Sequence, residues 1–107
     1  MELRVINVNE DKSSIVYNSS DCQQLISSMD DYYSKIGFNE PWVGYFVFNK
    51  NQVVGTGGFT WQPKDGKVEI AYWTFKDFEG QGIASFTCKE LIAISKGTDP
   101  TLIITAK

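Results

Sequence analysis

The sequence predicts a single α/β (α+β) domain with its elements in the order strand, helix, three strands, helix, strand (β-α-β-β-β-α-β). Two segments carry apolar residues every three or four positions, as on one face of a helix, and an aromatic-rich block between them alternates as strands do. The chain has 107 residues, 42% of them apolar and 14% aromatic, which is enough for one hydrophobic core but not for two. We therefore expect residues 1–107 to form one domain, with a mixed sheet around a central antiparallel meander and helices on both faces.

Composition and charge exclude several classes of function. The net charge is −3 and Arg4 is the single arginine, so the chain lacks the cluster of basic residues that binds nucleic acid. No apolar run approaches the ~20 residues of a membrane helix, and the start of the chain does not have the pattern of a signal peptide. We expect a cytoplasmic protein with neither a nucleic-acid nor a membrane partner.

The chain has no histidine, which excludes Ser-His-Asp triads, Cys-His pairs and the common zinc sites. We therefore expect no metal site, and chemistry that uses carboxylates, hydroxyls, main-chain dipoles or a bound cofactor. Cys22 and Cys88 lack CxxC spacing and are expected to be small core residues. Acidic residues outnumber basic ones up to Glu40, which either steers a cationic substrate or is an ordinary solvated surface.

The first two elements are a short strand and a helix. Alternating apolar residues predict a strand over Leu3–Val8. Ser20 and Gln23 have the spacing of a capping box, which predicts that a helix begins there. Apolar residues within 25–36 recur at helical spacing, and Gly37 follows as the usual left-handed stop.

Three strands are then expected to form an antiparallel meander. The block is apolar on both alternating faces, as in strands that are covered on both sides. Asp65-Gly66 is a strong signal for a hairpin turn between the last two strands. Most aromatic residues of the block are expected in the core, with Trp61, at a strand end, as the exception. The predicted strands are Trp42–Phe48, Val53–Trp61 and Val68–Phe75.

Three glycines, Gly55, Gly57 and Gly58, lie inside the middle strand, where glycine normally weakens pairing. They indicate a bulge or a close approach of another group to the backbone. A structural bulge is the simpler interpretation, and a gap that faces a ligand is the alternative.

The end of the sequence predicts a loop, a helix and a final strand. Residues 76–82 form a loop with two glycines, and a helix is expected over Ile83–Lys96, with Gly97 as its stop. Pro100 breaks the chain before Leu102–Ile104, an apolar run that is expected to form a buried parallel strand. The far edge of that strand would be unpaired.

Glycines at the start of the second helix have the pattern of an anion-binding loop. Gly80, Gly82 and Ala84 directly follow a strand and open a helix. The first N–H groups of a helix have no partners inside it and point toward an anion, and glycines let the backbone come close to that anion. A loop of this kind can hold a pyrophosphate, to which the hydroxyl of Ser85 would donate a further hydrogen bond. The alternative is that the glycines serve only to form the turn. Neither the Walker nor the Rossmann glycine pattern is present.

The stretch VEIAYW, followed by FEGQGIAS, resembles the GNAT acetyltransferase family, and within it the branch of ribosomal-protein N-terminal acetyltransferases. The resemblance covers about the whole chain, because helix, meander, glycine loop, helix and last strand come in the family's order. It implies a GNAT-like sheet and acetyl-CoA as cosubstrate. In the family the pantetheine lies where the fourth strand splays from the fifth, here Val68–Phe75 and Thr101–Ala106, and the following loop binds the pyrophosphate.

The resemblance also implies a set of cofactor-binding residues. Glu79 stands where the family usually has Arg or Gln, so we expect its carboxylate to turn outward and Lys76 to offset it in part. The family's last helix and two strands, with an asparagine and a tyrosine acid, have no counterpart in these 107 residues. The implied cofactor-binding residues are Trp73, Thr74, Phe75, Glu79, Gly80, Gln81, Gly82, Ile83, Ala84 and Ser85.

The mechanism that the resemblance implies is direct attack of an amine on the thioester. Backbone N–H groups near Tyr72–Phe75 would hold the oxyanion. Glu69 is the candidate base, directly or through water, because alternation places it on one apolar face with Ala71 and Trp73. The alternative for Glu69 is a rim carboxylate on a solvated strand end, and Glu40 is a weaker second candidate.

Together these features predict an acetyl-CoA-dependent N-acetyltransferase that moves an acetyl group to a primary amine, on a small molecule or a peptide N-terminus. Two alternatives are kept. One is a module that binds CoA without turnover. The other is a structural unit whose exposed last strand pairs with another chain, as in a homo-oligomer.

Overall fold

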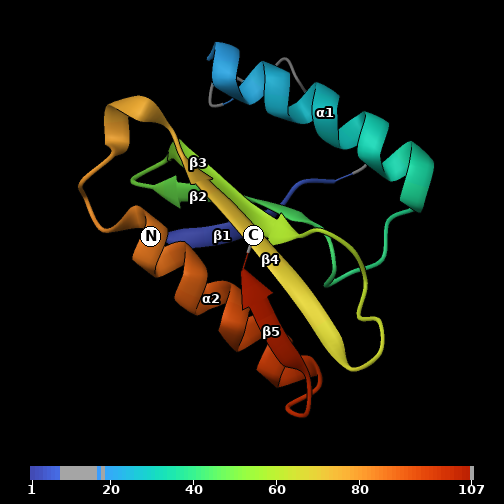
Figure 1. The fold of residues 1–107 in the computed structure, drawn as a ribbon. Coiled ribbons are helices and arrows are strands. Elements are labelled where there is room, and N and C mark those ends of the chain that lie inside the picture. The colour runs from blue at the N-terminus through green and yellow to red at the C-terminus, as the bar shows by residue number, and fades with distance from the viewer. Residues whose placement is uncertain (8–16, 18, 107) are drawn as a thin grey trace.

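Five strands form one mixed sheet whose spatial order is the order of the chain (Figure 1). The computed structural model describes residues 1–7, 17 and 19–106. The predicted central meander and the parallel last strand are confirmed. The antiparallel neighbours are β1 (Glu2–Val5), β2 (Gly44–Asn49), β3 (Gln52–Phe59) and β4 (Lys67–Thr74), and β5 (Ile103–Ala106) is parallel to β4.

Two helices, α1 (Ser20–Ile36) and α2 (Ile83–Thr98), lie on opposite faces of this sheet, as Figure 1 shows. α1 buries Ile26 in a cluster with Phe46, whereas α2 buries Ile83 in a cluster with Val47. Phe46 and Val47 are consecutive in β2, and consecutive residues of a strand point to opposite faces. The apolar run of β2 is thus explained, because this strand is covered on both sides.

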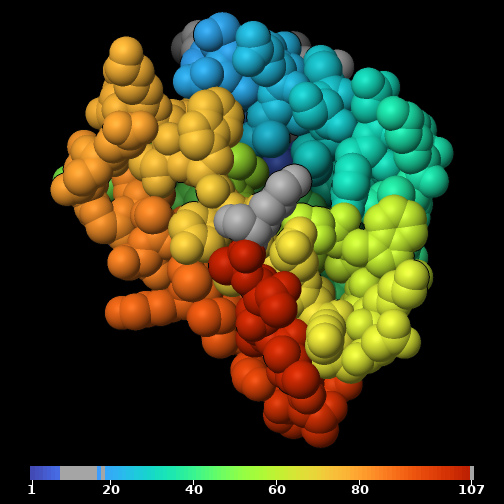
Figure 2. All heavy atoms as spheres, in the orientation of Figure 1, coloured from blue at the N-terminus to red at the C-terminus, as the bar shows by residue number. Residues whose placement is uncertain are grey.

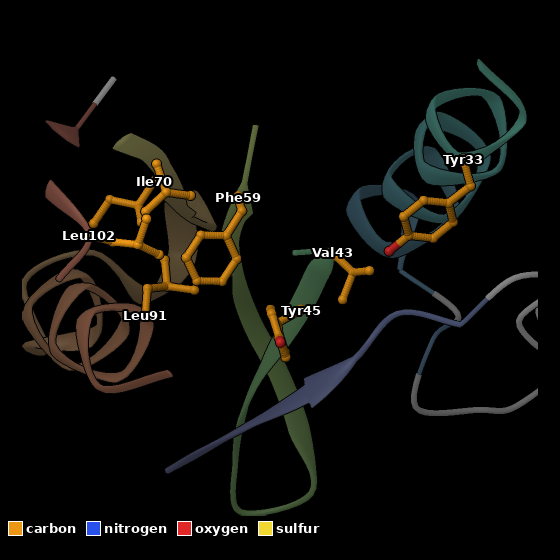
Figure 3. Close-up of a cluster of buried hydrophobic side chains, with 8 residues drawn as sticks. Tyr33, Val43, Tyr45, Phe59, Ile70, Leu91 and Leu102 are labelled. Carbon is orange, nitrogen blue, oxygen red and sulfur yellow. The ribbon is translucent and has the colours of Figure 1, made fainter. Parts of the chain in front are cut away.

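One buried cluster extends from α1 through the sheet to α2 (Figure 3). Its hydroxyls are paired, since Tyr33 donates to the Ile6 carbonyl (2.8 Å) and accepts from the Gly44 N–H (3.1 Å). Tyr45 donates to the Pro41 carbonyl (2.7 Å), and burial raises the pKa of Tyr45 to about 12, so this phenol stays neutral. The cluster comprises Tyr33, Val43, Tyr45, Phe59, Val68, Ile70, Leu91 and Leu102.

The start of α1 differs from the prediction by one residue. Ser19, not Ser20, is the N-cap, and its side chain accepts from the Cys22 N–H at 3.2 Å. Gln23 does not close a capping box, because its amide donates to the Tyr17 carbonyl at 2.6 Å. Two adjacent serines are chemically equivalent caps, so their spacing alone does not choose between them. The helix ends at the predicted Gly37, but φ of 85° with ψ of 174° is not the predicted left-handed helical conformation.

Several strands also begin or end at other residues than predicted, in part because main-chain groups near their ends form hydrogen bonds within turns. β1 ends at Val5, and Val8 lies outside the described residues. β2 begins at Gly44 because the N–H groups of Trp42 and Val43 donate to carbonyls of the preceding turn. β3 ends at Phe59, and Trp61 beyond it is 47% exposed, which confirms that this aromatic lies outside the core.

The predicted hairpin between β3 and β4 is confirmed. Asp65 and Gly66 have φ values of 54° and 75°, as the two central residues of a type I′ turn do. The flanking Lys64 and Lys67 exchange main-chain hydrogen bonds of 2.9 and 3.0 Å. This turn fixes the register that β4 takes along β3.

The glycines of β3 are explained by a bulge and by a close approach. The pairing register shifts between Val47 and Phe48 of β2, which leaves Val54 of β3 as an extra residue beside Gly55. At Gly57, a Cβ atom would lie 2.4 Å from Cγ2 of Thr87 on α2. α2 therefore packs directly on the bare backbone of β3.

The predicted stop of α2 at Gly97 is wrong, because the helix continues to Thr98. The Asp99 N–H still donates to the Ser95 carbonyl at 2.9 Å, so the last turn is complete. The Asp99 carboxylate then accepts from the Thr101 N–H (3.0 Å) and hydroxyl (2.6 Å). These bonds lower the pKa of Asp99 and turn the chain toward β5. The local stop is thus an aspartate turn and not a left-handed glycine.

The last strand is the edge of the sheet in the part of the chain that the structure describes. β5 begins at Ile103, one residue later than predicted, and Leu102 is buried beneath it. Ile103 itself is 58% exposed. Within residues 1–7, 17 and 19–106 no helix has the length and apolarity that crossing a membrane requires.

We expect Gly57→Ala to lower the free energy of unfolding by about 1–3 kcal/mol, because the new methyl group overlaps Thr87 and forces α2 away from β3. The measurement is chemical denaturation. Gly97→Ala is the matched control, since a Cβ there meets nothing within 4 Å and glycine inside a helix is unfavourable. That variant should gain about 0.5–1 kcal/mol. Equal stability of Gly57→Ala and the parent chain would contradict this packing.

Candidate active site

The second half of β4 has one open edge. β4 pairs with β5 only from Lys67 to Ile70, and no described residue pairs with 71–74 on that side. The Glu69 carbonyl and the Phe75 N–H bond to the β3 side, at 3.0 and 2.9 Å. Because main-chain groups of an antiparallel strand alternate in direction, Tyr72 and Thr74 point theirs toward the open edge.

The loop after β4 delivers free N–H groups to the same place. Gly82 is the N-cap of α2 with φ 77°, a left-handed conformation that favours glycine, and no side chain caps this end. Phe86 is the first residue whose N–H bonds within the helix, to the Gly82 carbonyl at 3.1 Å. The N–H groups of residues 83–85 therefore have no partner inside α2. They form the positive end of the helix dipole.

These donors border a cavity of about 420 Å³, which we call the α2 cavity. It brings together all of the expected cofactor-binding residues except Phe75 and Gln81. Phe75 is buried in the α1 cluster and Gln81 is exposed outside the lining. Because the Phe75 N–H is bonded to the Val54 carbonyl, it is not available to an oxyanion, and the expected range of donors narrows to Tyr72 and Thr74. The lining residues are Trp73, Thr74, Glu79, Gly80, Gly82, Ile83, Ala84 and Ser85.

Glu79 is the one acidic residue in this lining, and it is exposed. Its N–H donates to the Lys76 carbonyl at 3.4 Å and closes the short 3₁₀ turn Lys76–Phe78. We predicted that the carboxylate of Glu79 turns outward and that Lys76 partly offsets its negative charge, and both statements stay predictions.

A second cavity, of about 380 Å³, lies between α1 and the sheet, and we call it the α1 cavity. In Figure 2 the surface is hollowed between the blue atoms of α1 and the yellow atoms at the end of β4. Ala71 and Tyr72 line the α1 cavity, and the next two residues of β4 line the α2 cavity. Consecutive residues of β4 therefore line the two cavities. The other lining residues are Leu25, Met29 and Tyr32 of α1, Gly44, and residues 56–60.

The sequence did not predict the α1 cavity. The spacing of Leu25, Met29 and Tyr32 predicts only the apolar stripe of a helix, yet these residues line the α1 cavity on the side of α1. The Tyr32 hydroxyl donates to the Thr60 carbonyl and ties α1 to the end of β3. The available signal was the glycines of β3, since Gly57 and Gly58 both line this cavity.

Neither of the two candidate bases, Glu69 and Glu40, lines a cavity. Glu69 is half-buried on β4, two residues before Ala71 and on the same face, but it lines neither cavity. Its surroundings are less apolar than expected, because Trp73 on that face is 49% exposed. Glu40 is exposed in the turn before β2 and also lines neither cavity.

Tyr72 and Cys88 form a contact that the sequence did not indicate. Tyr72 is 41% exposed, and Cys88 on α2 is half-buried rather than fully in the core. The electrostatic interaction and hydrogen bond with Cys88 raise the pKa of Tyr72, so the phenol stays protonated at neutral pH. Among the described residues, no group of three or more acidic or cysteine side chains is placed to hold a metal ion.

Comparison with known proteins places this geometry in a family. The fold is similar to the apo crystal structure of RimL, described as a ribosomal L7/L12 alpha-N-protein acetyltransferase, with a TM-score of 0.53 and 19% sequence identity. The match covers 85% of this chain and 49% of that one, so the chain spans about half of the RimL structure. No curated protein sequence matches. A family described as the acetyltransferase (GNAT) domain matches residues 5–106, and the chain therefore belongs to the GNAT acetyltransferase family.

Proposed function

We propose that this chain binds acetyl-CoA along the open edge of β4 and transfers the acetyl group to a primary amine. The observation that carries the proposal is that consecutive residues of β4 line the α1 cavity and the α2 cavity. Membership of a family that generally uses acetyl-CoA supports it. RimL, named as an alpha-N-protein acetyltransferase, has the same fold over about half of its length.

The α2 cavity suits the pyrophosphate of a CoA ester. The unpaired N–H groups of residues 83–85 and the dipole of α2 are donors that an anion satisfies. A Cβ at Gly80 or Gly82 would meet no protein atom within 4 Å, so both glycines border open space. The volume of about 420 Å³ is in the range of small-molecule sites, ~300–1,000 Å³.

The open edge of β4 suits the remainder of the cofactor. Tyr72 and Thr74 present N–H and C=O groups there, which are the partners that the amides of pantetheine require. A cofactor that begins at α2 and follows this edge brings its thioester to Ala71 and Tyr72. The thioester then opens onto the α1 cavity, which is the place for the amine acceptor.

The transfer step needs a base and an oxyanion donor. The nitrogen of the neutral amine bonds to the acetyl carbonyl carbon and the carbon–sulfur bond breaks. The amine loses one proton to the base, and the thiolate that leaves takes up one proton, so the products are the amide and free CoA thiol. The N–H of Tyr72 or Thr74 stabilises the carbonyl oxygen as its negative charge grows. Glu69 takes the amine proton through a water molecule, since it lies about 6.6 Å along the strand from Ala71, two residues at ~3.3 Å each.

We expect acetyl-CoA to raise the melting temperature of the chain. At 100 times Kd, a ligand of the folded state stabilises it by about 2.7 kcal/mol. Gly82→Glu should abolish the shift, because it puts a carboxylate and a strained backbone beside the pyrophosphate. Gly97→Glu carries the same charge at the far end of α2 and should keep the shift. An unchanged melting temperature at millimolar acetyl-CoA would count against the whole proposal.

We expect Glu69→Gln to lower kcat for acetyl transfer by about 10² or more, which is the contribution typical of a general base. The shift in melting temperature with acetyl-CoA should persist, because Glu69 does not line the α2 cavity. Glu90→Gln on α2 is the control and should leave kcat unchanged. A wild-type kcat in Glu69→Gln would remove Glu69 from the mechanism. Cofactor binding without transfer to any amine would instead support a module that only binds CoA.

A further inference from the structure

The α1 cavity is lined mainly by apolar atoms. Among the described residues that line it, none has a charged side chain, and Leu25, Met29 and Phe59 contribute apolar walls. The Tyr32 hydroxyl, one of its few polar groups, already donates to the Thr60 carbonyl. The cavity therefore suits hydrocarbon better than a charged or strongly polar group.

This cavity extends across three strands of the sheet. Ala71 of β4 lies opposite Gly58 of β3, and Gly58 lies opposite Gly44 of β2. All three residues line the α1 cavity. On β2 the cavity is limited by Met29, because a Cβ atom at Gly44 would lie 2.6 Å from the Met29 sulfur. The cavity thus begins at the open part of β4 and ends where Met29 packs on Gly44.

An acetyl group would leave most of this space unfilled. The cavity measures about 380 Å³, more than ten times the ~30 Å³ that one water molecule occupies in the liquid. The methyl of an acetyl group is about as large as one water molecule. Water beside apolar walls has few hydrogen-bond partners, whereas each methylene buried there contributes about fourfold in affinity. A longer hydrocarbon chain is therefore the better occupant.

The proposed path of the cofactor brings such a chain to the cavity. The thioester lies at Ala71 and Tyr72, and both residues line the α1 cavity. Neighbouring strands are ~4.8 Å apart, and an extended chain covers ~3.3–3.6 Å for every three bonds, so the two strand spacings from β4 to β2 need about eight bonds. An unbranched chain of up to about eight carbons would therefore reach Gly44, where Met29 stops it.

We propose that the preferred donor is a CoA thioester with an unbranched, saturated acyl chain of about four to eight carbons, and that the α1 cavity holds this chain. This inference rests on the proposed function for the path of the cofactor and makes the acyl donor specific. Acetyl-CoA stays a donor, but it binds less tightly. The amine shares the entrance of the cavity at Tyr72, and the chain takes the part from Ala71 toward Gly44.

The transfer step is balanced in the same way for the longer group. The nitrogen of the neutral amine bonds to the acyl carbonyl carbon, and the carbon–sulfur bond breaks. The amine loses one proton to the base, and the thiolate that leaves takes up one proton. The products are the longer amide and free CoA thiol.

Titration calorimetry of the wild-type chain with a series of CoA thioesters tests the proposal. The ligands are acetyl-, butanoyl-, hexanoyl-, octanoyl- and decanoyl-CoA, each below the concentration at which it forms micelles. We expect the Kd of hexanoyl-CoA to be at least tenfold lower than that of acetyl-CoA, since it buries four more methylenes at about fourfold each. Decanoyl-CoA should bind no more tightly than octanoyl-CoA, because Met29 ends the cavity.

Two variants place the chain in the α1 cavity. Met29→Ala opens the space above Gly44, so decanoyl-CoA should then bind at least threefold more tightly than octanoyl-CoA, about the effect of one buried methylene. Met29→Leu is the control of similar size and should keep the wild-type order. Leu25→Trp narrows the cavity from α1 and should reduce the advantage of hexanoyl-CoA over acetyl-CoA at least threefold. It tests the location even if Met29→Ala does not fold.

The outcomes separate the two proposals. Equal or weaker binding of hexanoyl-CoA than of acetyl-CoA would overturn this inference and leave the acetyltransferase in place. A chain-length preference that neither Met29→Ala nor Leu25→Trp alters would also overturn it, because the chain would then lie elsewhere. If no CoA thioester binds, the proposed function and this inference fail together. Binding in the expected order without transfer to any amine would overturn the proposed transfer and support the assigned chain site.

Discussion

The contact between α2 and the bare backbone of β3 is the constraint on which the site depends. Gly57 has no side chain, so Thr87 and Leu91 of α2 reach the main chain of the sheet there. This contact fixes the axis of α2, and with it the direction of the free N–H groups at the start of the helix. Those groups then border the same cavity as the end of β4. The α2 cavity is thus positioned by packing at a residue that does not line it.

On the other face of the sheet, α1 is held by hydroxyls as well as by apolar contact. Tyr33 bonds to both Ile6 and Gly44, and Tyr32 bonds to the end of β3. These bonds satisfy main-chain groups that burial would otherwise leave unpaired. They tie α1 to the sheet on either side of the α1 cavity, which Gly44, Gly57 and Gly58 help to line.

Much of the fold could be predicted from the sequence, because its signals are local. The Asp65-Gly66 turn, the apolar stripe of α1 and the Gly80-x-Gly82 loop each depend on a few neighbouring residues. The predictions from sequence failed where contacts outside the local pattern determine the structure. Gly97 looks like a helix stop in isolation, but the bonds between Asp99 and Thr101 set the actual end. The α1 cavity was missed for the same reason, since it exists only when helix and sheet are assembled.

The donors that we assign to the pyrophosphate are main-chain N–H groups of residues 83–85. A main-chain donor is present whatever the side chain is, and the positive φ values of Gly80 and Gly82 restrict the residue type at those two positions of the loop. Neighbouring positions are therefore open to substitution without loss of the donors, as Glu79 illustrates where the family usually has Arg or Gln. A chain can therefore keep this backbone path while most of the side chains along it change.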